Sequence, residues 1–123
     1  MLDSSIHRLL EEHINSSTKL TIVMLYAGEK SLNATVADVS RRLWSNIWSI
    51  GPALEELAAD GVLVVENGGY RLDPAPERRD TLRRLLALYD EPMHRQEIMR
   101  VVAELDRYAP YREMLNSQTV TVF

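Results

Sequence analysis

The sequence predicts a mostly helical α+β domain with one small β-hairpin, and three observations support this fold class. Apolar residues recur at spacings of three and four over most of the chain, as on one face of an α-helix. Short apolar runs at 62–65 and 70–72 enclose Asn67, Gly68 and Gly69, which are typical of a tight turn between two strands. The length of 123 residues allows one buried core. We therefore expect a single domain.

Two helices are expected in the first quarter of the chain. The first lies within residues 1–16, where Ser4 or Ser5 can cap its start. Its apolar face consists of Ile6, Leu9, Leu10 and Ile14. Helical spacing at 20–27 predicts a second helix that ends near Gly28. The β-branched residues within this second segment also allow a strand.

A pair of helices separated by a polar break follows. Thr35 and Asp38 form the pattern of a capping box, so we expect a helix from Val36 to Leu43. After Ser45 and Asn46, a further helix is predicted whose apolar positions are Ile50, Leu54 and Leu57 and whose end is Gly61. Pro52 is tolerated best within a first helical turn, so Ser49 is the predicted cap of the regular part.

The C-terminal part is expected to be helical over residues 77–115. Apolar residues recur helically at Leu82, Leu85, Leu86 and Tyr89, and again at Ile98, Val101, Val102 and Leu105. Pro92 either ends the first of these helices or opens the second. Residues 118–123 alternate like a strand, which would need a sheet edge for pairing.

From Thr35 to Leu72 the sequence resembles the winged helix-turn-helix family of prokaryotic transcription regulators. The matching residues are Thr35-Val-Ala-Asp-Val, Leu43, and Leu54-Glu-Glu-Leu-Ala-Ala-Asp-Gly-Val-Leu. The resemblance implies a winged helix-turn-helix core at 18–73 with flanking N- and C-terminal helices, all within one domain, 1–123. It also implies DNA binding through a recognition helix at about Ser49–Ala59, and pairing as a homodimer through the flanking helices. Their surplus amphipathic surface also favours a homodimer.

The resemblance suggests a set of DNA contacts on and around the recognition helix. We expect phosphate or base contacts from Arg41, Arg42, Ser49, Arg71, Arg78 and Arg79, with Arg83 and Arg84 in the same basic cluster. The alternative is that the cluster pairs with Glu77, Asp80 and other neighbours on a solvated face. Residues 35–72 hold three basic and five acidic residues, which opposes a polyanion.

A second candidate surface surrounds the turn between the two motif helices. Trp44 and Trp48 either fill the core beneath the turn or lie exposed beside Pro52 and Glu55. An exposed pair would form an apolar contact surface for a protein partner or a small ligand. Two functions thus remain open: a DNA-binding transcription regulator, or a winged-helix protein-interaction or dimerisation module that does not bind DNA.

Composition and the absence of known motifs limit which kinds of protein and site remain possible. The chain has no cysteine and a net charge of -4, so disulfides and thiolate metal sites are excluded and a polyanion is repelled at long range. No apolar run approaches the roughly 20 residues of a membrane span, and residues 1–10 lack the apolar block of a signal peptide. We therefore expect a cytoplasmic protein with no membrane partner. His94 and Glu97 could supply two metal ligands or form a surface contact; no catalytic motif or cofactor site is recognised, so no enzyme is expected.

Overall fold

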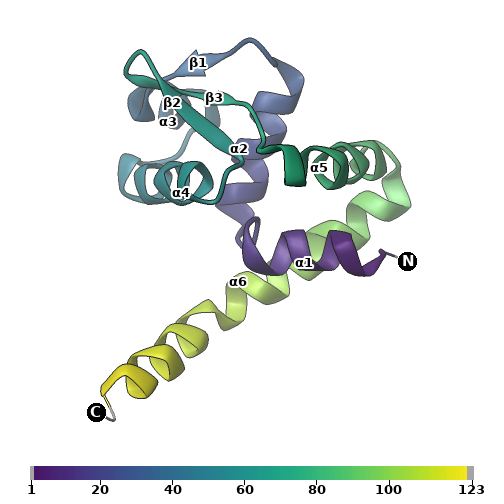
Figure 1. Cartoon of the computed structure of the whole chain (residues 1–123), viewed down its shortest axis with the longest axis vertical. Coiled ribbons are helices and arrows are strands. Elements are labelled where there is room, and N and C mark those ends of the chain that lie inside the picture. The colour runs from purple at the N-terminus through teal and green to yellow at the C-terminus, as the bar shows by residue number, and fades with distance from the viewer. Residues whose placement is uncertain (1, 122–123) are drawn as a thin grey trace.

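The computed structural model describes the backbone of residues 2–121 and the side chains of residues 2–109. Within this part the chain is mostly helical and carries one small antiparallel sheet (Figure 1). The elements in chain order are α1 (Ser4–Glu12), α2 (Ser17–Gly28), β1 (Asn33–Ala34), α3 (Val36–Leu43), α4 (Ile47–Ala59), β2 (Leu63–Glu66), β3 (Gly69–Leu72), α5 (Pro76–Tyr89) and α6 (Pro92–Thr121). The α+β class predicted from the sequence is confirmed.

The central helix of the fold is α2, which packs against α4, α6, β3 and α3. In Figure 1 the sheet lies above α2, α4 and α5 lie to either side of it, and α1 lies below α5. Three helices, α1, α5 and α6, pack against one another. Every element from α1 to α6 contributes to one hydrophobic core, whose largest fully buried side chains include Tyr26, Ile6, Leu10, Leu54 and Ile98. The chain thus forms one continuous core rather than two.

The sheet has the strand order β1-β3-β2, and both pairs are antiparallel. Asn67 and Gly68 have φ values of 54° and 79°, the pair of left-handed residues that a two-residue hairpin turn requires. Gly69 belongs to β3 rather than to the turn, and a Cβ there would lie 1.9 Å from Asn33 Oδ1. The predicted hairpin is confirmed, whereas β1 was not foreseen.

The capping groups confirm one prediction and correct two. Thr35 and Asp38 form the predicted capping box of α3. Neither Ser4 nor Ser5 caps α1, because the Asp3 carboxylate accepts the Ile6 amide at 3.0 Å. Ser49 does not cap α4 either. Asn46 Oδ1 accepts the Ser49 amide at 2.9 Å, so the helix begins earlier and includes Pro52.

The C-terminal helix α6 begins at Pro92, as one of the two readings of that proline required. Its buried residues Ile98 and Val102 pack on the body, and the Asp106 carboxylate accepts the Ser17 amide at 3.2 Å. Beyond this point α6 leaves the body and extends away from it (Figure 1). The strand predicted at 118–123 is wrong over 118–121, which belong to the helix, and residues 122–123 lie outside the described residues.

Candidate functional site

The turn between α3 and α4 places two tryptophans at the surface. Trp44 ends α3 with φ 55° and ψ 37°, the left-handed conformation. The Ser45 amide donates to the Ser40 carbonyl at 3.0 Å, and the Trp44 amide donates to the Arg41 carbonyl at 3.4 Å. These two bonds are those of a Schellman motif, in which glycine usually occupies the left-handed position. The chain can then reverse at once into α4.

The exposed fractions of the two tryptophan side chains decide between the two alternatives, core filling or exposure at the surface. Trp44 is 96% exposed, Trp48 is 83% exposed, and Ile47 between them is 51% exposed. None of the three therefore fills the core. We call Trp44, Ile47 and Trp48 the tryptophan patch. Of the two alternatives for the tryptophans, exposure is therefore the correct one. Ile47 also belongs to the tryptophan patch, and it was not identified from the sequence because it lies next to the apolar face of α4.

The outer face of α4 continues from the patch. Trp48, Pro52 and Glu55 follow one another at spacings of four and three, so they lie along one side of the helix, and all three are exposed. Glu55 forms no ion pair with a described side chain. Ser49 is also exposed. This face offers one indole ring, one carboxylate and a hydroxyl, but neither lysine nor arginine.

A buried lysine of α2 forms an ion pair with α4. Lys19 is only 7% exposed, and its Nζ lies 3.0 Å from Glu56 Oε2 and 3.1 Å from Asn15 Oδ1. The sequence pattern does not predict this ion pair, because Lys19 and Glu56 lie in different helices. The contact occupies Glu56, which leaves Glu55 as the carboxylate of α4 that faces solvent beside the patch.

The arginines of α3 and β3 for which DNA contacts are predicted are each held by carboxylates. Arg41 is paired with Asp38, and Arg42 Nη1 lies 3.0 Å from Glu29 Oε2. The amide of Thr35 is the main cause that lowers the pKa of the Asp38 carboxyl, and Arg41 adds to it. Arg71 on β3 donates to Glu66 at 2.6 Å, and this hydrogen bond is the main cause that raises the pKa of its guanidinium.

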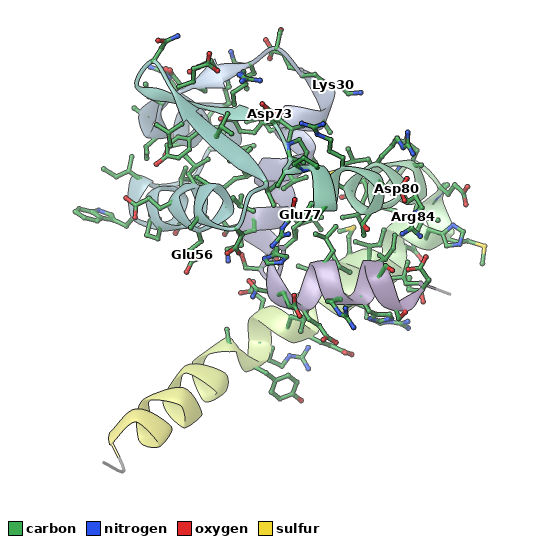
Figure 2. The ribbon with its side chains drawn as sticks, viewed as in Figure 1. Lys30, Glu56, Asp73, Glu77, Asp80 and Arg84 are labelled. Atoms are coloured by element: carbon green, nitrogen blue, oxygen red, sulfur yellow. The ribbon has the colours of Figure 1, made fainter. Side chains whose placement is uncertain are left out.

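The arginine cluster of α5 is paired in the same way. Arg83 and Arg84 both contact Asp80, and Arg84 also contacts Asp3 at 2.6 Å. Arg79 lies 3.7 Å from Asp73, and Arg78 lies 3.7 Å from Glu77. Figures 1 and 2 place α5, with Asp80 and Arg84, across α2 from α4. The alternative that these arginines pair with Glu77, Asp80 and their other neighbours describes the structure, and the cluster does not converge on the α4 face.

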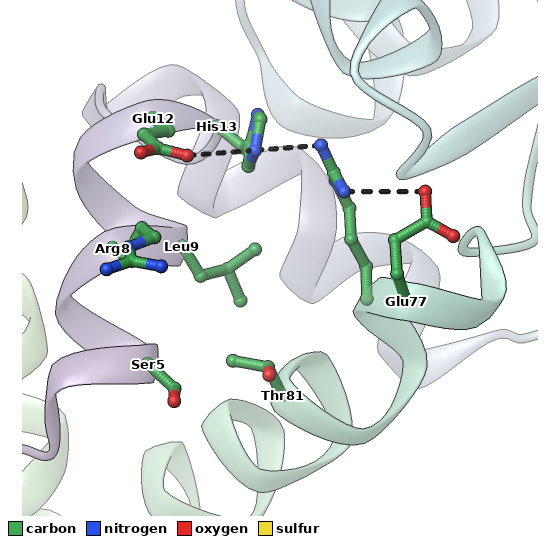
Figure 3. Close-up of a pocket in the computed structure, with 8 residues that line it drawn as sticks. Ser5, Arg8, Leu9, Glu12, His13, Glu77 and Thr81 are labelled. Carbon is green, nitrogen blue, oxygen red and sulfur yellow. Dashed lines mark hydrogen bonds and ion pairs between the residues drawn. The ribbon is translucent and has the colours of Figure 1, made fainter.

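A polar pocket lies between α1 and α5 (Figure 3). It measures about 240 Å³ and is lined by Ser5, Arg8, Leu9, Glu12, His13, Glu77, Arg78 and Thr81. Arg78 Nη2 lies 2.9 Å from His13 Nε2, and His13 Nδ1 lies 3.0 Å from Asp60 Oδ2 at the end of α4, although it is not aligned for a hydrogen bond. The sequence did not suggest this cluster, because its members come from three separate segments.

The remaining candidate chemistry is sparse among the described residues. His94 Nδ1 contacts Glu91, the residue before α6, so the histidine is engaged in a surface contact. No group of three potential metal ligands occurs in the described part of the chain. None of the helices in that part combines the length and the apolar character that crossing a membrane requires. Comparison with known proteins finds no matching family model, no matching curated protein and no matching solved structure.

Proposed function

We propose that residues 18–73 form a winged-helix domain and that this protein is a non-enzymatic interaction module. Two helices joined by a short turn and followed by a β-hairpin support the first part, as does the short strand before α3 that pairs with the hairpin. The binding surface is the tryptophan patch together with the outer face of α4. Its partner is a protein rather than DNA.

The observation that carries the proposal is the chemistry of the outer face of α4. In the family that the sequence resembles, the corresponding helix enters the major groove, where arginine, lysine, asparagine and glutamine read base edges and phosphates attract cations. Here this face carries Trp48, Pro52 and Glu55. A carboxylate and exposed indoles beside it favour an apolar protein interface and oppose a phosphate backbone.

A DNA-binding regulator is the second candidate, and one observation favours it. Arg41 and Arg42 lie exposed at the end of α3, next to the turn that leads into α4. Their ion pairs are at the surface, where such pairs contribute only about 0 to 1 kcal/mol, so phosphates can compete for the guanidiniums. In this candidate, Arg41 and Arg42 next to the α3–α4 turn and Arg71 on β3 are the phosphate contacts.

Fluorescence anisotropy with a labelled mixed-sequence duplex distinguishes the two candidates. The wild-type chain, an Arg41→Ala/Arg42→Ala variant and a Glu55→Arg variant are titrated at low and near-physiological salt. The proposal predicts no binding by the wild type even at low salt, and a gain of weak, salt-sensitive binding when Glu55 becomes arginine. Wild-type binding whose salt slope falls by about two in the double arginine variant would instead establish the DNA candidate.

A further inference from the structure

We propose that the tryptophan patch binds a basic segment of a partner protein, in which lysine or arginine side chains alternate with apolar ones. This inference rests on the proposed function and names the chemistry of the partner. The cationic groups stack on the indole rings of Trp44 and Trp48, while the apolar side chains cover Ile47. Each step rests on a feature of the α3–α4 face.

The first step is that Trp44 contributes nothing to the fold that would explain its presence. Its indole is 96% exposed, so it makes almost no packing contacts. Its φ of 55° is a conformation that bulky residues rarely adopt and that glycine adopts readily. Folding alone therefore favours glycine at this position. An exposed tryptophan held in an unfavourable backbone conformation is explained by contact with something outside the chain.

The second step is that the groups around the patch attract cations. The face of an indole ring is the strongest cation–π acceptor among the side chains. Pro52 has no N–H, so it donates no helical hydrogen bond to the Trp48 carbonyl. That carbonyl oxygen therefore keeps the acceptor capacity that this bond would use in a regular helix. Glu55 adds a carboxylate two turns along the same face, and the charges of Arg41 and Arg42 are offset by Asp38 and Glu29. The net charge of -4 attracts a basic partner at longer range.

The same charges disfavour other occupants of the patch. A nucleic acid would bring phosphates against Glu55 without a lysine or arginine on the outer face of α4. A second copy of the chain docked by the same patch would present the same outer face of α4, which carries no lysine or arginine to pair with Glu55, because a twofold interface pairs identical surfaces. A segment that carries positive charge satisfies both the carboxylate and the indole faces.

The chain contains a built-in reporter for this surface. Its only two tryptophans are Trp44 and Trp48, so intrinsic tryptophan fluorescence reports on the patch and on nothing else. Both indoles are exposed, so their emission in the unbound protein is expected to resemble that of tryptophan in water. Binding of an apolar and cationic segment should shift the emission to shorter wavelength.

The test selects partners from a library of displayed random peptides. The full chain and its Trp44→Gly variant are used as separate baits, with Met93→Ala as the matched control, since Met93 is an 84% exposed apolar side chain on α6. We expect peptides that are enriched on the wild type and on Met93→Ala, lost on Trp44→Gly, and rich in arginine or lysine next to apolar residues. A synthetic peptide from this set is then titrated by tryptophan fluorescence.

The titration should show at least tenfold weaker binding to Trp48→Ala, followed by the fluorescence of its remaining Trp44 or by peptide anisotropy, and a several-fold weaker affinity for Glu55→Gln. An unchanged or higher melting temperature of Trp44→Gly shows that lost binding is not lost folding. Patch-dependent peptides that are acidic or uncharged would overturn the basic partner but leave the protein-interaction function standing. Peptides that bind the wild type and Trp44→Gly equally, or no enrichment at all, would overturn both.

Discussion

Among single residues, Trp44 is the clearest conflict between folding and surface chemistry. We expect Trp44→Gly to raise the free energy of unfolding by about 1 kcal/mol, because glycine adopts the left-handed conformation without steric cost. Urea denaturation of both proteins measures this difference. Asn67→Gly is the matched control, since asparagine already tolerates its φ of 54°, and a gain of only a few tenths of a kcal/mol is expected there. Lower stability of Trp44→Gly would show that the indole supports the fold.

Tyr26 has the opposite character, since it is fully buried and its hydroxyl donates to the Tyr70 carbonyl at 2.9 Å. Burial raises the pKa of this phenol to about 12. The folded state therefore holds the proton more tightly than the unfolded chain does, and this contribution is complete below pH 10 and is lost as the pH rises toward 12.

Tyr26→Phe should remove both the hydrogen bond to the Tyr70 carbonyl and the pH dependence that the raised pKa of the phenol causes. At neutral pH the variant should lose about 1 to 2 kcal/mol, because the Tyr70 carbonyl loses its donor. Between pH 10 and 12 the difference between wild type and variant should shrink. Urea unfolding of the wild type and the variant, at neutral pH and between pH 10 and 12, measures their free energies of unfolding. A difference between the two proteins that stays constant with pH would contradict the role assigned to Tyr26.

Elements of the fold were predictable wherever local interactions define them. The capping box of Thr35 and Asp38 joins residues three apart, and the turn at Asn67 and Gly68 depends only on its own backbone, so both could be recognised in the sequence. By contrast, β1 is defined by pairing with β3: Asn33 opposes Arg71 across a long stretch of chain. Two residues with no local signal become a strand only when that partner is in place.

The same substitution has opposite expected signs at two glycines, one at the end of α2 and one just after α4. At Gly28, the last residue of α2, a Cβ would meet no atom within 4 Å, so Gly28→Ala should stabilise the protein by about 0.5 kcal/mol through helix propensity. At Gly61 φ is 78° and a Cβ would lie 3.2 Å from Ala75 Cβ, so Gly61→Ala should destabilise by about 1 kcal/mol or more. Thermal melts of the two variants compare them; shifts of the same sign would refute this account of the two glycines.

For the whole molecule, we expect the homodimer to depend on the part of α6 that projects from the body. The buried residues Ile98 and Val102 and the contact of Asp106 with Ser17 precede that part. We therefore expect a chain that ends at Arg107 to keep a similar melting temperature but to sediment as a monomer, while the full chain sediments as a dimer at roughly tens of micromolar. Trp44→Gly should remain dimeric, which separates this contact from the tryptophan patch. A monomeric full chain would contradict the dimer.

The sequence by itself determined the helical α+β class, the α3 boundaries, the hairpin and the core faces of α4 and α5, because these depend on spacing and on contacts within a few residues. Only the tertiary structure decided that Trp44 and Trp48 are exposed, since large aromatic side chains are equally compatible with a core and an interface. It also decided that Arg42 pairs with Glu29 and Arg84 with Asp3. Burial and ion pairing between distant segments depend on how the elements pack, and spacing along the chain does not encode that packing.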